Sequence, residues 1–137
     1  MQILLVSNAH EDAIAYALEI AGQLESNEDI IRDFGRFAPT TVGDQKWSPG
    51  KGTFSVAGRT KRARGAQFTV ECRGMASRVL GREADFVIVD DPTKQEDVET
   101  EVTRVKQLKH LREQVFTRAE PQQKGKPGGR ICGVGQR

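Results

Sequence analysis

Four consecutive apolar residues, Phe86–Val89, run directly into the acids Asp90 and Asp91 and then into Pro92. An apolar run of this length is typical of a strand covered on both faces, as in a parallel sheet between helices. A second run, ILLV at residues 3–6, has the same character. Because such strands must be covered by helices on both sides, they restrict the chain to an α/β architecture.

Helical periodicity follows the first strand. Asn8 and Glu11 have the spacing of an N-terminal capping pair, and apolar residues then recur every three or four positions. These apolar residues are Ile14, Ala17, Leu18, Ala21 and Leu24. We therefore expect a strand, a tight turn and a helix over residues 3–26.

A second helix is expected after Pro92. Thr93 and Glu96 fit a capping box, with acids near the start of the segment and bases near its end, which suits the helix dipole. The helix is expected to end at about residue 118, and its apolar stripe is Val98, Val102, Val105, Leu108, Leu111 and Val115. A loop and a final strand, Arg130–Val134, follow.

The middle of the chain has a different pattern. Residues 27–52 are polar and rich in glycine, proline and aspartate, which predicts loop structure with Trp47 as a local core anchor. Residues 53–57 and 67–72 alternate as half-buried strands do, and a basic connection joins them as a hairpin-like excursion. The expected fold is one α/β domain over residues 1–137: a mainly parallel sheet with flanking helices and a small antiparallel elaboration.

Composition excludes several kinds of protein. Charged residues make up 29% of the chain, but the net charge is only +2, which by itself does not argue for nucleic-acid binding. No run approaches the roughly 18–20 apolar residues of a membrane span. Cys72 and Cys132 lack metal-site spacing and lie in apolar surroundings, so we expect two buried free thiols in a reducing cytosol.

Polar residues gather where the expected strands end, at Ser7–Asn8, Asp90–Asp91 and Gly135–Arg137. Chemistry in open α/β sheets collects at the carboxyl ends of strands. Two acids there must face a cation, water or a polar crevice, because burying unpaired charge is costly. Adjacent strand residues point to opposite sides, so one acid is suited to the shell of Mg²⁺ and the other to orienting or deprotonating a water. The alternative is a simple turn, which Asp-Asp-Pro also favours.

Residues 81–137 contain, in order, Gly81, the acid-terminated strand Phe86–Pro92, the long helix from Thr93 with Thr117–Arg118 near its end, the turn Gly128–Ile131, and the strand end Gln136–Arg137. With these features, the segment closely resembles the ATPase domain of large terminase subunits, the motors that package DNA into tailed-phage heads. Two earlier segments, ILLVSNAHEDAIAYALEI and WSPGKGTFSVAGR, resemble the family's regions before this strand. The resemblance implies an incomplete P-loop NTPase-like fold of the ASCE type.

The resemblance also implies roles for particular residues. Asp90 takes the Walker B position that holds Mg²⁺ through water, and Asp91 takes the position of the catalytic carboxylate, where many such motors carry Glu. Gln136 and Arg137 fall where the coupling motif senses the γ-phosphate of ATP, so they join Asp90 as expected ATP-binding residues. The implied partners are double-stranded DNA, the portal protein and the small terminase subunit. The resemblance also implies that copies of the chain form a homo-oligomeric ring, in the host cytoplasm and with no membrane partner.

One motif of the family is not found. The phosphate loop G-x-x-x-x-G-K-[ST] has only weak counterparts, SPGKGTFS at 48–55 and KGKPGG at 124–129. We therefore expect the chain to be the middle of a terminase ATPase domain, with the phosphate-loop segment upstream and the nuclease domain downstream absent. We expect the full-length protein to hydrolyse ATP and the isolated chain to be inactive.

Several alternatives remain open. Arg59, Lys61, Arg62 and Arg64 are weak candidates for contacts with DNA phosphates, the alternative being a solvated basic loop. For the chain as a whole, the alternatives are a helicase-like or other P-loop ATPase fragment and a catalytically inactive prophage remnant or partner module.

Overall fold

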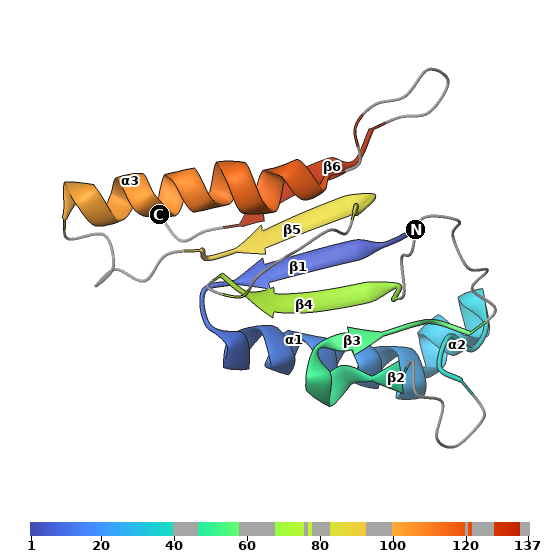
Figure 1. Ribbon diagram of the computed structural model, residues 1–137. Coiled ribbons are helices and arrows are strands. Elements are labelled where there is room, and N and C mark those ends of the chain that lie inside the picture. Colours follow the sequence, from blue (N-terminus) through green and yellow to red (C-terminus); the bar gives the residue numbers. More distant parts are fainter. Residues whose placement is uncertain are drawn as a thin grey trace.

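The computed structural model describes most of the chain, namely residues 1–39, 47–57, 68–75, 77, 83–92, 100–119, 121 and 128–134. These residues form a six-stranded sheet with helices packed against both faces (Figure 1). None of the helices in the described ranges is long and apolar enough to cross a membrane.

The sheet is mainly parallel, as expected. Its strands are β1 (Ile3–Ser7), β2 (Trp47–Ser48), β3 (Thr53–Phe54), β4 (Val70–Gly74), β5 (Phe86–Asp90) and β6 (Arg130–Val134). They lie in the order β2-β3-β4-β1-β5-β6. The four strands from β4 to β6 are parallel, and β2 and β3 add an antiparallel extension beside β4. The antiparallel elaboration predicted from the sequence is thus confirmed for β3, but the second predicted strand, at residues 67–72, corresponds to β4 and belongs to the parallel part of the sheet.

Helix α1 (His10–Ser26) covers one face of the sheet through three small buried residues, Ala13, Ala17 and Ala21. Alanines let the helix approach the strands closely. The expected helix is confirmed, but its buried face is rotated from the predicted one, since Leu18 is 51% exposed.

The expected capping pair of Asn8 and Glu11 is wrong. The N-cap residue is Ala9, and no side chain caps the helix. Asn8 still belongs to the link from β1, where its carbonyl oxygen accepts a hydrogen bond from the N–H of Met75. The helix therefore begins too late for the Asn8 side chain to cap it.

A second helix, α2 (Glu28–Phe34), lies in a stretch predicted to be loop. The Asn27 side chain accepts hydrogen bonds from the N–H groups of Asp29 and Ile30, and Gly35 ends the helix with a φ of 83°. The helix has no buried residue. Because capping rather than an apolar stripe specifies this helix, its periodicity gave no sign of it.

The expected local anchor near β2 is confirmed. The ring of Trp47 packs on that of Phe54, with the ring centroids 4.9 Å apart. Both residues belong to the core between the sheet and α1. The 3₁₀ turn η1 (Pro49–Lys51) connects β2 to β3.

On the other face, a continuous helical segment runs through α3 (Glu101–His110), the π-helical turn η3 (Leu111–Val115) and the 3₁₀ turn η4 (Phe116–Arg118). Thr100 caps its start by accepting a hydrogen bond from the N–H of Thr103. The segment ends where the sequence predicts. Thr93 and Glu96, the expected capping box, lie outside the described residues.

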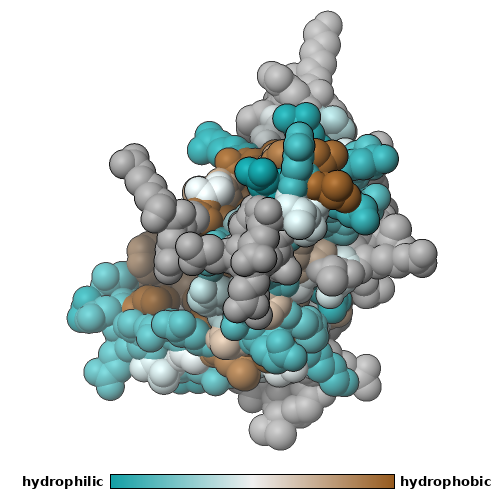
Figure 2. All heavy atoms as spheres, turned by 90° about the vertical axis from the view of Figure 1, so that its left-hand side faces the viewer, coloured by the Kyte–Doolittle hydropathy of each residue, from teal (hydrophilic) through white to brown (hydrophobic). Residues whose placement is uncertain are grey.

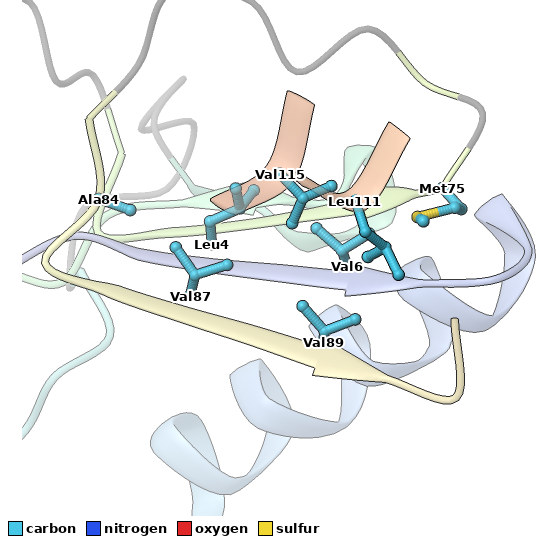
Figure 3. Packing of buried hydrophobic residues seen from close by; sticks show 8 residues of the cluster. All are labelled: Leu4, Val6, Met75, Ala84, Val87, Val89, Leu111 and Val115. Atoms are coloured by element: carbon cyan, nitrogen blue, oxygen red, sulfur yellow. The ribbon is translucent and has the colours of Figure 1, made fainter. Parts of the chain in front are cut away.

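Only the end of this segment packs on the sheet. Leu111 and Val115 are buried, and Figure 3 shows side chains of β1 and β5 pointing toward them: Leu4, Val6, Val87 and Val89. In contrast, Val102, Val105 and Leu108 are more than half exposed. Figure 2, which faces the carboxyl ends of the strands, shows hydrophobic atoms gathered in its upper part, where α3 lies. Of the described residues in the predicted apolar stripe, only Leu111 and Val115 therefore belong to the core, and Val98 lies outside the described residues.

The two cysteines differ in exposure. Cys72 in β4 is fully buried, as expected, and burial raises the pKa of its thiol to about 12. Cys132 is exposed, and the prediction that it is buried is wrong. All of β6 is exposed, and none of its residues belongs to the core on either face of the sheet; among the described strands it pairs only with β5.

Replacing Val115 with alanine tests whether the end of the second helical segment holds the core together. Val115 has no exposed surface, so Val115→Ala should lower the free energy of unfolding by about 2 kcal/mol through lost burial and a residual cavity. Urea denaturation measures this loss. The matched control is Val102→Ala at a site that is 65% exposed, where the same truncation should change stability little. Equal effects at both sites would contradict this packing.

Thiol labelling tests the positions of the cysteines. In the folded chain at pH 8, Ellman's reagent should react promptly with Cys132 only, because Cys72 is buried and its raised pKa keeps it protonated. After denaturation both thiols should react. Prompt labelling of Cys72 in the Cys132→Ser variant under native conditions would show that β4 is not in the interior.

Candidate functional site

The parallel strands bring their carboxyl ends to one edge of the sheet. Ser7 at the end of β1 lies opposite Asp90 of β5 on one side and opposite Gly74 of β4 on the other. Asp90 in turn lies opposite Val134 of β6. In Figure 1 the arrowheads of β4, β1 and β5 point the same way. The expected meeting of the polar ends of β1 and β5 is confirmed, whereas Gln136 and Arg137 lie outside the described residues.

The Asp90 side chain lies on the α1 side of β5. Val87 and Val89 belong to the core on the α3 side, and strand residues alternate between the two faces. The hydroxyl of Tyr16, in the second turn of α1, donates a hydrogen bond of 2.6 Å to Oδ2 of Asp90. A residue of the helix thus holds one oxygen of the expected Mg²⁺-associated acid.

Asp91 occupies a different position. It is exposed, and its φ of 37° places it in the left-handed region, which aspartate tolerates better than most residues do. Its backbone N–H donates a 2.9 Å hydrogen bond to the carbonyl oxygen of Val134. The chain therefore turns at Asp91, so the turn that was the alternative prediction for this pair is present.

The start of α1 forms one side of this edge. A Cβ atom built on Gly74 would lie 2.8 Å from the backbone nitrogen of His10, so only glycine fits between the end of β4 and the helix. Beside it, the carbonyl oxygen of Ser7 accepts a 2.7 Å hydrogen bond from the N–H of Met75. The first turns of α1 are thereby fixed close to the ends of β1 and β4.

Negative charge is concentrated around Tyr16. The hydrogen bond to Asp90 is the main cause that raises the pKa of Tyr16, followed by the charge of Asp90, by burial, and by the charges of Asp12 and Asp91. All of these favour the neutral phenol. The phenol of Tyr16 therefore lies in a negatively charged environment to which acids of both α1 and the end of β5 contribute.

The donor chemistry fits Mg²⁺ rather than a metal bound by many side chains. Within the described ranges, no group of three or more histidine, cysteine, aspartate or glutamate residues is placed to hold a metal ion. Asp90 and Asp91 offer carboxylate oxygens, and Mg²⁺ in nucleotide sites takes one or two carboxylates, with water and phosphate completing its shell. The pair thus suits an ion that arrives with a phosphate ligand.

The other predicted site residues are not brought to this edge by any described contact. The candidates for DNA contact, Arg59, Lys61, Arg62 and Arg64, lie outside the described residues. Lys51 of the weak phosphate-loop counterpart lies in η1, which follows the short antiparallel strand β2. A phosphate loop is expected to follow a parallel strand, so this position does not fit one.

Sequence reasoning missed Tyr16 and Asp12. A helix that follows a parallel strand begins at that strand's carboxyl end, so its first two turns lie near the site. Residues 10–16 are these turns, and they hold the chain's only tyrosine. That placement was a usable signal, although it does not identify Asp90 as the partner.

Comparisons with known proteins do not assign the chain to a family. No protein-family model matches the chain, and no curated protein matches it.

Absorbance titration of Tyr16 tests the contact with Asp90. The chain has one tyrosine, so tyrosinate absorbance reports it alone, and its pKa should exceed the ordinary value of 10.0. Asp90→Asn should lower the pKa toward 10, and Asp91→Asn should lower it less, because Asp91 makes the smallest contribution. Stability from this bond should be fully present below about pH 10 and lost as pH rises through the raised pKa. An ordinary pKa in the unmodified chain would contradict the contact.

Proposed function

We propose that the chain is the central part of a terminase-like ATPase domain with a P-loop NTPase-like sheet, acting in packaging viral DNA. The observation that carries the proposal is the adjacency of the carboxyl ends of β1, β5 and β6, with Asp90 and Asp91 at that edge. An acid-terminated strand in the middle of a parallel sheet is the arrangement that the family resemblance implies.

The exposure of β6 supports the proposed incompleteness. All five residues of β6 are exposed, including Ile131 and Val134, whereas no residue of β1 or β5 is exposed. Parallel strands are ordinarily buried on both faces, and an unpaired strand edge is a template for another strand. We assign this edge to the strand that carries the family's phosphate loop.

The two acids have separate tasks in this proposal. Mg²⁺ bound with ATP neutralises charge on the phosphates. Asp90, whose carboxylate accepts the hydrogen bond from Tyr16, would bind water in the shell of the ion. Asp91, exposed on the turn one residue later, would accept a proton from the attacking water. Its side chain is shorter than the glutamate that many such motors carry, so a closer approach of the water is required.

The proposal extends to residues outside the described ranges. Gln136 and Arg137 would sense the γ-phosphate, the role that the family resemblance implies for them. Arg59, Lys61, Arg62 and Arg64 would contact DNA phosphates. The proposed partners remain double-stranded DNA, the portal protein, the small terminase subunit and further copies in a ring in the host cytoplasm.

Sequencing the coding region upstream of this chain tests whether a strand that carries a phosphate loop pairs with the open edge of β6. We expect a strand-like segment followed by G-x-x-x-x-G-K-[ST], in the same frame or in an adjacent split gene. Upstream sequence without such a segment would favour the inactive remnant over the motor.

Calorimetry with Mg²⁺ and ATP tests the chemistry. The isolated chain should neither bind nor hydrolyse ATP at ordinary concentrations, since it has no phosphate loop to hold the β- and γ-phosphates. In a protein that also carries the phosphate loop, Asp91→Asn should lower kcat by about 10²–10⁴-fold while leaving ATP affinity little changed. Asp12→Asn is the control, an acid near the same edge with no proposed catalytic task. If the isolated chain hydrolyses ATP and Asp91→Asn abolishes that hydrolysis, the proposal that the chain is catalytically incomplete is wrong. If Asp91→Asn leaves turnover unchanged in the protein that carries the phosphate loop, the proposed role of Asp91 is wrong.

A further inference from the structure

We propose that the open edge of β6 pairs with the same edge of a second copy of this chain, antiparallel and about a two-fold axis at Cys132. Among the described strands β6 pairs only with β5, and all five of its residues are exposed. An unpaired strand edge is a template for another strand, and β6 contains no proline or lysine that would block it. The inference goes beyond the proposed function and concerns the chain without the upstream strand that the proposal assigns to this edge.

The pairing with β5 decides which backbone groups of β6 face outward. The N–H of Arg130 and the carbonyl oxygen of Val134 each form a 2.9 Å hydrogen bond with a backbone group at one end of β5. Successive residues of a strand direct their N–H and C=O groups to opposite edges. Arg130, Cys132 and Val134 therefore face β5, whereas Ile131 and Gly133 present their donors and acceptors to the open edge.

This edge is complementary to a second copy of itself. In the antiparallel register centred on Cys132, Ile131 of each copy lies opposite Gly133 of the other, and each such pair exchanges two backbone hydrogen bonds. The isoleucine side chain fits beside the glycine, where an added Cβ would meet nothing within 4 Å. The register also pairs all five residues of β6, from Arg130 to Val134, with five of the second copy.

Charge complementarity favours the same register. Asp90 lies opposite Val134, and in the pair Val134 lies opposite Arg130 of the second copy, on the same face of the sheet. Neighbouring strands are about 4.7–4.9 Å apart, so an arginine side chain laid across Val134 can reach the Asp90 carboxylate about two strands away. In its own copy Arg130 lies opposite Phe86, at the other end of β5. Each copy thus brings a cation to the strand-end acids of the other.

The paired surface is small, which determines how the dimer should behave. A stable interface buries about 1,200–2,000 Å², and one edge of five residues buries less. The reduced dimer should therefore be weak and reversible. A disulfide can capture it, because Cys132 lies opposite Cys132 of the second copy in a non-hydrogen-bonded pair. The Cα atoms of such a pair are about 4.5 Å apart, within the roughly 4.4–6.8 Å range of disulfides.

Disulfide capture of the folded chain at pH 8 tests the pairing. Diamide serves as the oxidant, taking up the two electrons and two protons that two thiols release as they join. Cys132 should give disulfide-linked dimers on a non-reducing gel, and Cys72 should not compete because it is buried. The matched control is Cys132→Ser combined with Val134→Cys, which places an exposed thiol on the same strand and the same face. This thiol lies about 13 Å from its counterpart across the axis, so it should give dimers at least about tenfold more slowly. Equal rates at the two positions would mean random collision and would overturn the proposal.

Two further variants test the contacts of the pair. Ile131→Pro removes an N–H that faces the open edge and none that bonds to β5, so it should slow capture about fivefold or more and leave the free energy of unfolding little changed. Arg130→Glu should also slow capture, because it places an acid beside Asp90 of the other copy. Arg36→Glu, an equal change of charge at an exposed residue beyond α2, should leave the rate unchanged.

The outcomes separate this inference from the proposed function. If Ile131→Pro and Arg130→Glu both form dimers as fast as the unmodified chain, the pairing of two β6 edges is wrong. That result would leave the assignment of the edge to a phosphate-loop strand intact, because the upstream sequence tests that assignment. If the upstream sequence contains no phosphate loop but capture at Cys132 is fast and register-specific, the proposed function loses support and the pairing stands.

Discussion

The parallel pairing of β1 on both of its edges is the constraint on which the rest of the structure depends. β1 lies between β4 and β5, and its residues are buried on both faces, against α1 on one side and against Leu111 and Val115 on the other. A short strand with no polar side chain before Ser7 is stable only in such a position. Its pairing sets the register of both neighbours, and with it the edge at which their carboxyl ends meet.

The candidate site follows from that register. Ser7 lies opposite Gly74 on one side and opposite Asp90 on the other, and the helix that leaves β1 begins packed against Gly74 of β4. Tyr16 in its second turn then reaches the Asp90 carboxylate, while Asp91 lies on the turn that follows. Two adjacent acids with the same chemistry thereby acquire different surroundings, one held by a phenol and the other exposed. This difference is the physical basis for giving them separate tasks.

Sequence patterns predicted the parts of the fold that burial specifies. The strands at Ile3–Ser7 and Phe86–Asp90 and the helix after the first of them were predictable, because continuous apolar runs and helical spacing mark buried surfaces. Helix α2 was not, since capping by Asn27 rather than an apolar face defines it. The exposure of Cys132 and Val105 was not predicted, because both lie in apolar sequence patterns. Their exposure depends on the tertiary arrangement, which decides which strand forms an edge of the sheet and where a helix leaves it. The acids of the site were found from their place at a strand end, whereas Tyr16 required the contact between α1 and β5.

The most direct measurement is a double-mutant cycle between Tyr16 and Asp90, because their contact joins α1 to the strand end and depends on the register of β1 and β5. The free energies of unfolding of Tyr16→Phe, Asp90→Ala and the double variant, compared with the unmodified chain at pH 7, give the coupling between the two side chains. A favourable coupling, lost when the tyrosine ionises at high pH, is the predicted result. Strictly additive effects of the two substitutions would show that the side chains do not meet, and would contradict the arrangement of the strand-end site.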